Sequence, residues 1–480
     1  MDTPESILLT ALASGLHIVG IALALHALCK RHTPQGSIAW ILGLTMLPWI
    51  SIPLYMVLGV GRIKRHTSHR HSRESIANFL KCHGAWRSPQ SRLSRTLCNC
   101  TGYAPCSANA ATILRDGNAT YRDLLQAIRN AKDSILLEFF IIRNDRVGNA
   151  LKKALEEQAA KGVRVYVIYD EVGSHKLPIG FLKSLRRFGV CISSFNGKRF
   201  WLSSILRINY RNHRKLVVID GETAYLGSLN IGLEYLQGKH RPYWRDTFVK
   251  LRGPIVCQCL ISFLDDWKRA TGEQLKGLDK HPAPVGPHSC QLITSGPDDH
   301  PVNLWQLTLL ELAAASSKKL WLASPYFVPT SAVKEALCAA ALRGVDVRIL
   351  IPRRGDNTAA QLAMYTFIPE MLACGVRMLA YEPGFLHEKV CVMDGGVSCI
   401  GTANLDTRSL RLNFELTLLL EDTDLTQQLT SMLEEDMSQA RDITPAQWYK
   451  APFPPGFSQI VAAFFPLRYN LVLENPTMVC

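Results

Sequence analysis

The chain has 480 residues, of which 47% are hydrophobic and 20% charged, so it can bury a large core and is not a disordered chain. Its 32 Gly and 25 Pro follow no regular period, which excludes a collagen-like or low-complexity protein. The 54 Lys and Arg against 40 Asp and Glu give a net charge of +14, which favours an anionic partner, either nucleic acid or an acidic lipid surface.

Two apolar segments open the chain. Residues 7–28 contain no charged residue and are followed by Lys30 and Arg31, and a second uncharged run covers 37–60. Because a helix of about 20 residues crosses a hydrocarbon core of ~30 Å, the two runs predict a transmembrane hairpin. A signal peptide followed by a buried helix is the alternative. It fits less well, because residues 1–5 lack the basic residues with which signal peptides begin.

The second apolar segment carries Pro48 and Pro53, which kink a helix, so this segment either spans the membrane or is re-entrant. A basic flank follows it, whereas the turn before it holds only two basic residues. The flank contains Arg62, Lys64, Arg65, Arg70 and Arg73. Basic flanks stay on the cytoplasmic side, so both termini and the large downstream region are predicted to be cytoplasmic.

The 14 cysteines form neither a compact disulfide framework nor a metal-binding motif. Cys98, Cys100 and Cys106 lie close together, but a zinc site would want a C-x2-C pair with a matching partner pair, which the sequence lacks. We therefore expect free, mostly buried thiols in a reducing compartment.

After a basic stretch at about 61–109, strand and helix signals alternate, which predicts a parallel or mixed sheet covered by helices. In one part of the chain, strand-like runs flank a helical segment at 134–142, 151–158 and 162–169. The same order recurs about 180 residues later, at 319–327, 333–340 and 344–351. A repeat of this length predicts a duplicated domain rather than a solenoid unit.

Each copy of the repeat contains the pattern H-x-K-x4-D-x6-G-[ST]-x-N. In the first copy its residues are His213, Lys215, Asp220, Ser228 and Asn230. In the second copy they are His387, Lys389, Asp394, Thr402 and Asn404. Residues two apart share one face of a strand, so each His projects together with its Lys. A single H-x-K pair is commonplace, but two with identical spacing inside a repeated domain indicate a functional site.

A histidine beside a lysine, with a hydroxyl and a carboxamide nearby, suits a phosphate diester. Lysine and asparagine can neutralise and hydrogen-bond the non-bridging oxygens through the transition state. Imidazole can attack phosphorus or move a proton near neutral pH. Two such sets meeting across a pseudo-twofold axis would supply one histidine for each task.

The paired H-x-K-x4-D motifs resemble those of the phospholipase D superfamily, and the resemblance covers nearly the whole chain. The N-terminal hairpin and the segments 324–329, 404–409 and 413–415 are similar to the membrane-anchored bacterial cardiolipin synthases of that superfamily. The resemblance implies an α/β fold in which two duplicated phospholipase D-like domains share one active site at a pseudo-twofold interface. We divide the chain into transmembrane helices within 1–60, a basic linker at 61–109, a first domain at 110–290, a second domain at 291–430 and a tail at 431–480.

The resemblance implies a reversible phosphatidyl transfer between two phosphatidylglycerol molecules, giving cardiolipin and glycerol through a phosphatidyl-histidine, with no metal or nucleotide cofactor. It suggests His213 as the nucleophile and His387 as the general acid and then base, but the sequence leaves this order open. The phosphate would be held by Lys215, Lys389, Asn230 and Asn404 with Ser228 and Thr402. The resemblance gives Asp220 and Asp394 an organising role through hydrogen bonds. Glu415 and Asp246 are candidates to orient a histidine ring, with a solvated surface role as the alternative.

Other functions compete with this one. A phospholipase D-type hydrolase or a nuclease would use the same residues, and a non-enzymatic scaffold would have no need of two complete motifs. The hairpin argues against a nucleic-acid partner and favours phosphatidylglycerol, cardiolipin and an anionic membrane surface. The expected location is the bacterial inner membrane, with the catalytic domains on the cytoplasmic side. The apolar run 457–466 either rests on the membrane surface or packs as a terminal helix.

Overall fold

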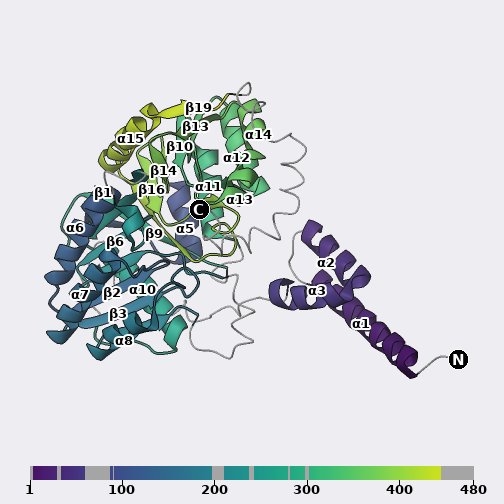
Figure 1. The fold of residues 1–480 in the computed structure, drawn as a ribbon. Coiled ribbons are helices and arrows are strands. Elements are labelled where there is room, and N and C mark those ends of the chain that lie inside the picture. Colours follow the sequence, from purple (N-terminus) through teal and green to yellow (C-terminus); the bar gives the residue numbers. More distant parts are fainter. Residues whose placement is uncertain are drawn as a thin grey trace. The chain divides into compact units, whose positions relative to one another are not determined.

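The computed structural model describes residues 4–29, 34–59, 87–89, 91–196, 210–236, 243–278, 280, 282–297 and 302–444. The basic flank at 62–73 and the apolar run at 457–466 therefore lie outside the described residues. The described residues divide into an N-terminal helical unit and an α/β unit (Figure 1).

The N-terminal unit begins with helix α1 (Pro4–Cys29), in which Thr10–Cys29 is long and apolar enough to cross a membrane. The second apolar segment is not one continuous helix, unlike the span expected over 37–60. It consists of α2 (Pro34–Met46), α3 (Pro48–Leu54) and the π-helix η1 (Tyr55–Gly59). Pro48 occupies the first turn of α3, where a missing N–H is tolerated, and cannot continue the hydrogen bonding of α2. At 1.5 Å per residue, α2 covers only about 20 Å.

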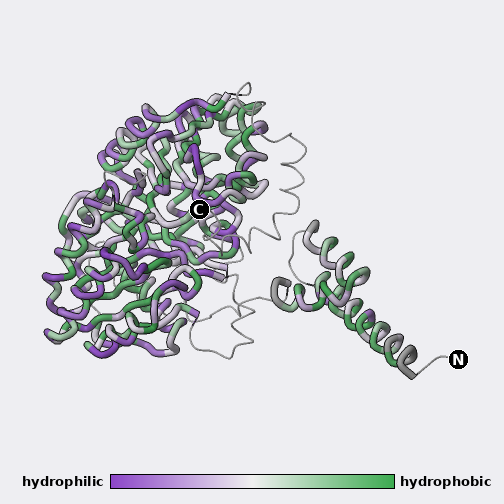
Figure 2. Tube along the Cα trace, viewed as in Figure 1, coloured by the Kyte–Doolittle hydropathy of each residue, from purple (hydrophilic) through white to green (hydrophobic). Residues whose placement is uncertain are grey.

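Helix α1 packs closely on α2 at Gly20. A Cβ at this position would lie 2.3 Å from the carbonyl oxygen of Leu44, so only glycine permits the approach. Ala24, Ala27, Leu44 and Tyr55 form a small buried cluster. Many large apolar side chains of this unit are nevertheless exposed, among them Leu8, Leu12, Ile18, Leu25, Leu28, Ile38, Met46 and Trp49. Figure 2 shows the unit as mainly hydrophobic, and an exposed apolar surface of this kind marks a membrane or protein contact.

The α/β unit is built on one mixed 15-stranded sheet, so the predicted α/β class is confirmed. Its first half contains β1 (Cys106–Arg115), β2 (Ser134–Phe139), β3 (Arg164–Tyr169), β4 (Cys191–Ser194), β5 (Leu216–Ile219), β6 (Thr223–Gly227) and β8 (Thr247–Arg252). Its second half contains β9 (His288–Ser295), β10 (Lys319–Ala323), β12 (Asp346–Pro352), β13 (Arg377–Tyr381), β15 (Val390–Met393), β16 (Val397–Gly401), β18 (Glu415–Glu421) and β19 (Ala440–Asp442).

Followed outward from the β1–β9 pair, the strand order corresponds in the two halves over seven strands, and the second half adds β19 at its edge. One direction runs β1-β8-β6-β5-β2-β3-β4, and the other runs β9-β18-β16-β15-β10-β12-β13-β19. The outer strands β2, β3 and β4 are parallel, as are β10, β12 and β13. Strands β5 and β15, which follow the two H-x-K motifs, therefore hold equivalent places in the sheet.

Helices cover the sheet, and each half has its own core (Figure 1). The first half carries α6 (Asp116–Arg129), α7 (Arg146–Ala160), α8 (Ile179–Arg187) and α10 (Ile255–Thr271), with the short 3-10 helix η2 (Leu233–Tyr235). The second half carries α11 (Leu304–Ala315), α12 (Ser331–Leu342), α13 (Thr358–Tyr365), α14 (Ile368–Ala373) and α15 (Thr423–Ser438). On α7, Leu151, Ala154 and Leu155 recur at helical spacing and face the core of the first half, which explains why the sequence forms a helix there.

Several elements fall outside the expected domain boundaries. Helix α5 (Arg92–Thr101) lies within the stretch expected to be a linker, and its Leu93 and Leu97 join the core of the second half. Helix α15 and strand β19 extend the second half to Asp442, beyond the expected boundary at 430, because Leu429 and Leu433 of α15 are fully buried. Buried apolar side chains thus tie both segments to the α/β unit.

The cysteines of the described part of the chain are free thiols, seven of them buried. Within the same residues, no group of three or more His, Cys, Asp or Glu side chains is arranged to hold a metal ion.

Candidate active site

Each histidine of the two motifs is fixed by backbone contacts with the opposite half of the α/β unit. The N–H of His213 donates to the carbonyl oxygen of Phe414 at 2.9 Å, and the N–H of His387 donates to that of Arg245 at 2.8 Å. Strand β14 (Gly384–Leu386), just before His387, pairs in parallel with β7 (Tyr243–Arg245) of the first half. The segments before the two histidines therefore cross between the halves in the same way.

The ring of each histidine meets a buried carboxylate from the opposite half. Nδ1 of His213 lies 2.9 and 3.0 Å from the two carboxylate oxygens of Glu415. Nδ1 of His387 lies 3.1 and 3.2 Å from those of Asp246. Both carboxylates are fully buried, so the surface role considered for them is excluded. With Nδ1 held in this way, Nε2 is the ring nitrogen left to react with a substrate.

Two buried lysines lie beside the histidines. Nζ of Lys215 donates to the carbonyl oxygen of His213 at 2.7 Å, and Nζ of Lys389 donates to that of His387. Burial lowers the pKa of Lys389 to about 8, against the opposing charges of Asp246 and Glu415. Burial also lowers the pKa of Lys215 well below its usual value, and the positive charge of Lys389 adds to this fall. The two ammonium groups repel each other, so an anion bound beside them would be favoured.

The pKa values of both histidines lie well below the ordinary value. Burial lowers the pKa of His213 to about 4; Lys215 and Lys389 act in the same direction, and Glu415 opposes them. Burial likewise lowers the pKa of His387 to about 4, with the charges of Lys389 and Lys215 acting in the same direction. Each histidine thus feels the lysine of the opposite half, and both rings are neutral at pH 7.

The hydroxyl and carboxamide side chains of the two motifs are buried but are used differently. Thr402 donates to Glu415 at 2.6 Å, whereas Ser228 donates to the carbonyl oxygen of Thr247 at 2.9 Å. The Asn230 side chain accepts from the N–H of Ile141 at 3.1 Å and donates to the Tyr235 hydroxyl at 3.0 Å. The Asn404 side chain donates to Asp406 at 3.1 Å, and its Oδ1 is buried with no hydrogen-bond partner among the described residues.

The two motif aspartates are not brought to the histidines. Asp220 follows β5 and lies five residues beyond Lys215, roughly 16 Å away along an extended strand. It accepts hydrogen bonds from the backbone N–H groups of Lys132, Asp133 and Ser134. Asp394 accepts equivalent bonds from Ser317, Lys318 and Lys319. Both carboxylates thus fasten the turn before the neighbouring strand rather than the reacting groups.

Sequence reasoning missed the aromatic surroundings of the rings. The ring of Phe140 lies edge-on to His213 with centroids 5.1 Å apart. Trp244 and Phe385 lie 5.4 and 5.9 Å from His387, centroid to centroid. Trp244 and Phe385 belong to the paired strands β7 and β14, and their proximity in space has no signal in the linear sequence. These rings keep water from the faces of the imidazoles and contribute to their low pKa values.

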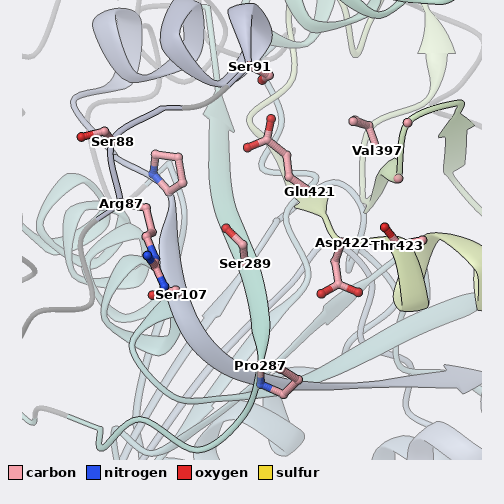
Figure 3. Close-up of a pocket in the computed structure, with 13 residues that line it drawn as sticks. Arg87, Ser88, Ser91, Ser107, Pro287, Ser289, Val397, Glu421, Asp422 and Thr423 are labelled. Atoms are coloured by element: carbon pink, nitrogen blue, oxygen red, sulfur yellow. The ribbon is translucent and has the colours of Figure 1, made fainter.

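A cavity of about 620 Å³ is found elsewhere in the α/β unit (Figure 3). Its described lining includes Arg87, Ser107, Glu421 and Asp422, but neither histidine and neither lysine of the two motifs. The cavity also touches Gly395 and Gly396, which follow Asp394 at the far end of β15. It is therefore separate from the histidine site.

Comparison with known proteins places this geometry in context. Residues 124–240 and 309–437 match the family described as cardiolipin synthase, phospholipase D-like domain. The chain is 41% identical over 442 residues to cardiolipin synthase A of Pseudomonas putida (strain W619), covering 90% of this chain and 92% of that protein. It is 38% identical over 451 residues to cardiolipin synthase A of Pseudomonas fluorescens (strain SBW25), covering 91% and 93%.

Among solved structures, the phosphatidylserine synthase of Haemophilus influenzae Rd KW20 is similar, with a TM-score of 0.58 over 80% of this chain and 98% of that one. The sequences are 15% identical, so this likeness concerns the fold alone.

Proposed function

The chain belongs to the family of cardiolipin synthases with phospholipase D-like domains and is an enzyme of phosphatidyl transfer; we propose that it joins two phosphatidylglycerol molecules into cardiolipin and glycerol. The observation that carries the proposal is the pair of crossed contacts, His213 with Glu415 and His387 with Asp246, beside two buried lysines. In this proposal the two halves are duplicated domains that share one site.

In the first half-reaction, Nε2 of His213 attacks the phosphorus of one phosphatidylglycerol. A P–N bond forms and the bond from phosphorus to the headgroup glycerol oxygen breaks, while His387 gives a proton to that oxygen. The free histidine is neutral, which suits a nucleophile. The proton on His387 becomes favourable once a phosphate diester binds, because the added negative charge raises the pKa of the ring.

In the second half-reaction, a headgroup hydroxyl of another phosphatidylglycerol attacks the same phosphorus. His387 takes the hydroxyl proton, the P–N bond breaks and cardiolipin leaves, which returns His213 to its neutral form. Lys215 and Lys389 hold the non-bridging oxygens in both steps, where charge must be stabilised without reorganisation. Glu415 and Asp246 orient the rings and stabilise their positive forms. One phosphate ester bond is exchanged for another, so the transfer is reversible.

We further propose that the N-terminal unit anchors the enzyme in the bacterial inner membrane, with the α/β unit on the cytoplasmic side. The exposed apolar side chains of α1, α2 and α3 support an anchor of this kind. An anchor raises the local concentration of lipid hydroxyls over the covalent intermediate and so favours transfer over hydrolysis. The net charge of +14 suits an anionic lipid surface.

The test uses purified full-length protein in mixed micelles with phosphatidylglycerol alone, followed by mass spectrometry. Cardiolipin appearing with one equivalent of glycerol is the expected result. Phosphatidic acid as the main product would mean that water is the acceptor, and the proposal of lipid-to-lipid transfer would be wrong.

A further inference from the structure

A further acidic side chain lies at the edge of the sheet that carries Lys389. Ala323 at the end of β10 pairs with Val390, the residue after Lys389, and β12 runs parallel to β10. The loops that follow β10 and β12 therefore leave the sheet beside Lys389, at the edge where parallel sheets bind ligands. Tyr326 lies in the first of these loops and Asp356 in the second.

Tyr326 and Asp356 are joined directly, because the Tyr326 hydroxyl donates to Oδ1 of Asp356 at 2.7 Å. The Asp356 side chain is exposed, yet its loop is held in place. The Gln361 side chain bonds the backbone of Arg353 at 2.9 Å and that of Gly355 at 3.3 Å. The carboxylate is thus fixed in position and remains open to a ligand.

The neighbourhood of Asp356 is linked to the candidate active site by charge and by hydrogen bonds. Burial lowers the pKa of Lys389, and the negative charge of Asp356 acts in the opposite direction. The loop that holds Tyr326 also contains Ser324, whose hydroxyl accepts from the N–H of Leu405, the residue after Asn404. Asp356 and Asn404 therefore belong to the same side of the site as His387 and Lys389.

The carboxylate that directly follows the corresponding strand of the first half, β3, is used differently. Asp170, which follows β3, is buried and accepts hydrogen bonds at 3.0 Å from the backbone N–H groups of Asn212, Val172 and Gly173. That carboxylate is used to hold the segment before His213. Asp170 and Asp356 therefore differ: Asp170 is buried and tied to the backbone, whereas Asp356 is exposed, as is Glu171 next to Asp170.

We propose that Asp356, positioned by Tyr326, binds the hydroxyl groups of the glycerol headgroup next to His387. The proposal rests on the proposed function. The glycerol that leaves in the first half-reaction and the headgroup that enters in the second occupy one position, because the second attack reverses the geometry of the first. The leaving glycerol has two adjacent hydroxyls that can donate to this carboxylate, and the incoming headgroup has one besides the hydroxyl that attacks.

The experiment measures acceptor choice by purified full-length protein in mixed micelles. Phosphatidylglycerol is supplied with a fixed amount of ethanol, which has one hydroxyl, and cardiolipin and phosphatidylethanol are quantified together by mass spectrometry. The variants are Asp356→Ala, Asp356→Asn and Tyr326→Phe. Glu382→Gln, which alters an exposed carboxylate paired with Arg353, is the matched control. Melting temperature identifies any variant that fails to fold.

We expect the ratio of cardiolipin to phosphatidylethanol to fall about 10- to 100-fold in Asp356→Ala, as for loss of a hydrogen bond to a charged group, and less in Tyr326→Phe. The control keeps the wild-type ratio. A folded Asp356 variant with the wild-type ratio would overturn the inference, as would an equal loss of both products. If the wild type made only phosphatidic acid, the proposed function would fail separately. The role of Asp356 would then be tested by the KM for phosphatidylglycerol, which should still rise in Asp356→Ala.

Discussion

Nδ1 of His213 meets Glu415, Nδ1 of His387 meets Asp246, and in both places a lysine ammonium donates to the carbonyl oxygen of the histidine. Around this shared arrangement the two centres differ in the residue between histidine and lysine. In the first motif it is Arg214, which forms a buried ion pair with Asp266. In the second it is Glu388, an acidic residue.

Glu388 belongs to a larger buried group of charges than Arg214 does. The Arg245 guanidinium lies 3.1 Å from Glu388, 2.8 Å from Asp436 and 3.2 Å from Asp116. Burial raises the pKa of Glu388 to about 7, although the charge of Arg245 opposes this. The two histidines are thus held alike, as the proposed attack on one shared phosphorus requires, while the surrounding ion pairs are set by the packing of each half.

The largest effect is expected at the histidines. His213→Ala and His387→Ala should each lower the rate of cardiolipin synthesis by at least about 10³-fold, and the double variant should be little worse, because residues that act as a unit are not additive. Melting temperature checks that each variant is folded. Mass spectrometry of the protein should show a phosphatidyl adduct in wild type or His387→Ala and none in His213→Ala. Near wild-type turnover in either variant would contradict the mechanism.

The next largest effect is expected at the two carboxylates. Glu415→Gln and Asp246→Asn should each lower kcat by about 10²-fold or more, because the ring loses its orientation and the countercharge of its positive form. Glu415 also accepts from Thr402, Ser409 and Asn413, so its variant should lose more than that of Asp246.

The control for Glu415 is Glu421→Gln at the far end of the same strand, β18, which should keep wild-type kcat. Equal losses in the Glu415 and Asp246 variants would show that the extra hydrogen bonds of Glu415 contribute nothing to catalysis.

The surrounding ion pairs should differ in stability. Arg245→Met removes the cation shared by Glu388, Asp436 and Asp116, of which Asp436 keeps an ion pair with Arg115, and should lower the free energy of unfolding by about 3–5 kcal/mol. Arg214→Met should cost less, because Arg214 faces the charges of Asp266 and Glu138, against three carboxylates at Arg245. Urea unfolding of the two purified variants in one detergent compares them. A larger loss of unfolding free energy in Arg214→Met than in Arg245→Met would mean that the charges around Arg245 contribute less to stability than the Arg214–Asp266 pair.

The smallest effect is expected where the motif aspartates fasten the turns. Burial raises the pKa of Asp394, but the N–H groups of Lys318 and Lys319 more than offset this and lower it to about 2. Its carboxylate therefore stabilises the fold fully above pH 3.8, and this contribution is lost as the pH falls through about 2. Asp394→Asn should cost about 1 kcal/mol near neutral pH, after allowance for solvent screening, and less in acid.

Unfolding of wild type and Asp394→Asn at pH 7 and pH 3 measures this difference. Asp220→Asn is the matched variant of the first half, and asparagine suits the positive φ of 54° at that residue. A difference between wild type and Asp394→Asn that grew in acid would contradict the assignment.

Local sequence patterns predicted much of the fold. Strands β2, β3 and β10 fall within the expected runs and β12 passes its run by one residue, because a buried parallel strand needs a continuous apolar stretch. The continuous second span was not found, because Pro48 starts a new helix. The α/β unit extends beyond the expected boundaries at 109 and 430, because it includes α5 and α15. Their apolar residues can be recognised as core residues only once their packing partners are known.

For the candidate site, the sequence by itself determined the family through its two motifs. It also determined the His–Lys pairs, because residues two apart in a strand share a face, which puts His213 beside Lys215 and His387 beside Lys389. Only the tertiary structure decided which carboxylate meets which ring. Glu415 lies 202 residues from His213 and Asp246 lies 141 residues from His387, and crossed contacts over such separations leave no local pattern. The structure also decided that Asp220 and Asp394 lie apart from the histidines. They are close to the histidines in the motif, but five residues of extended strand carry their side chains away from the site.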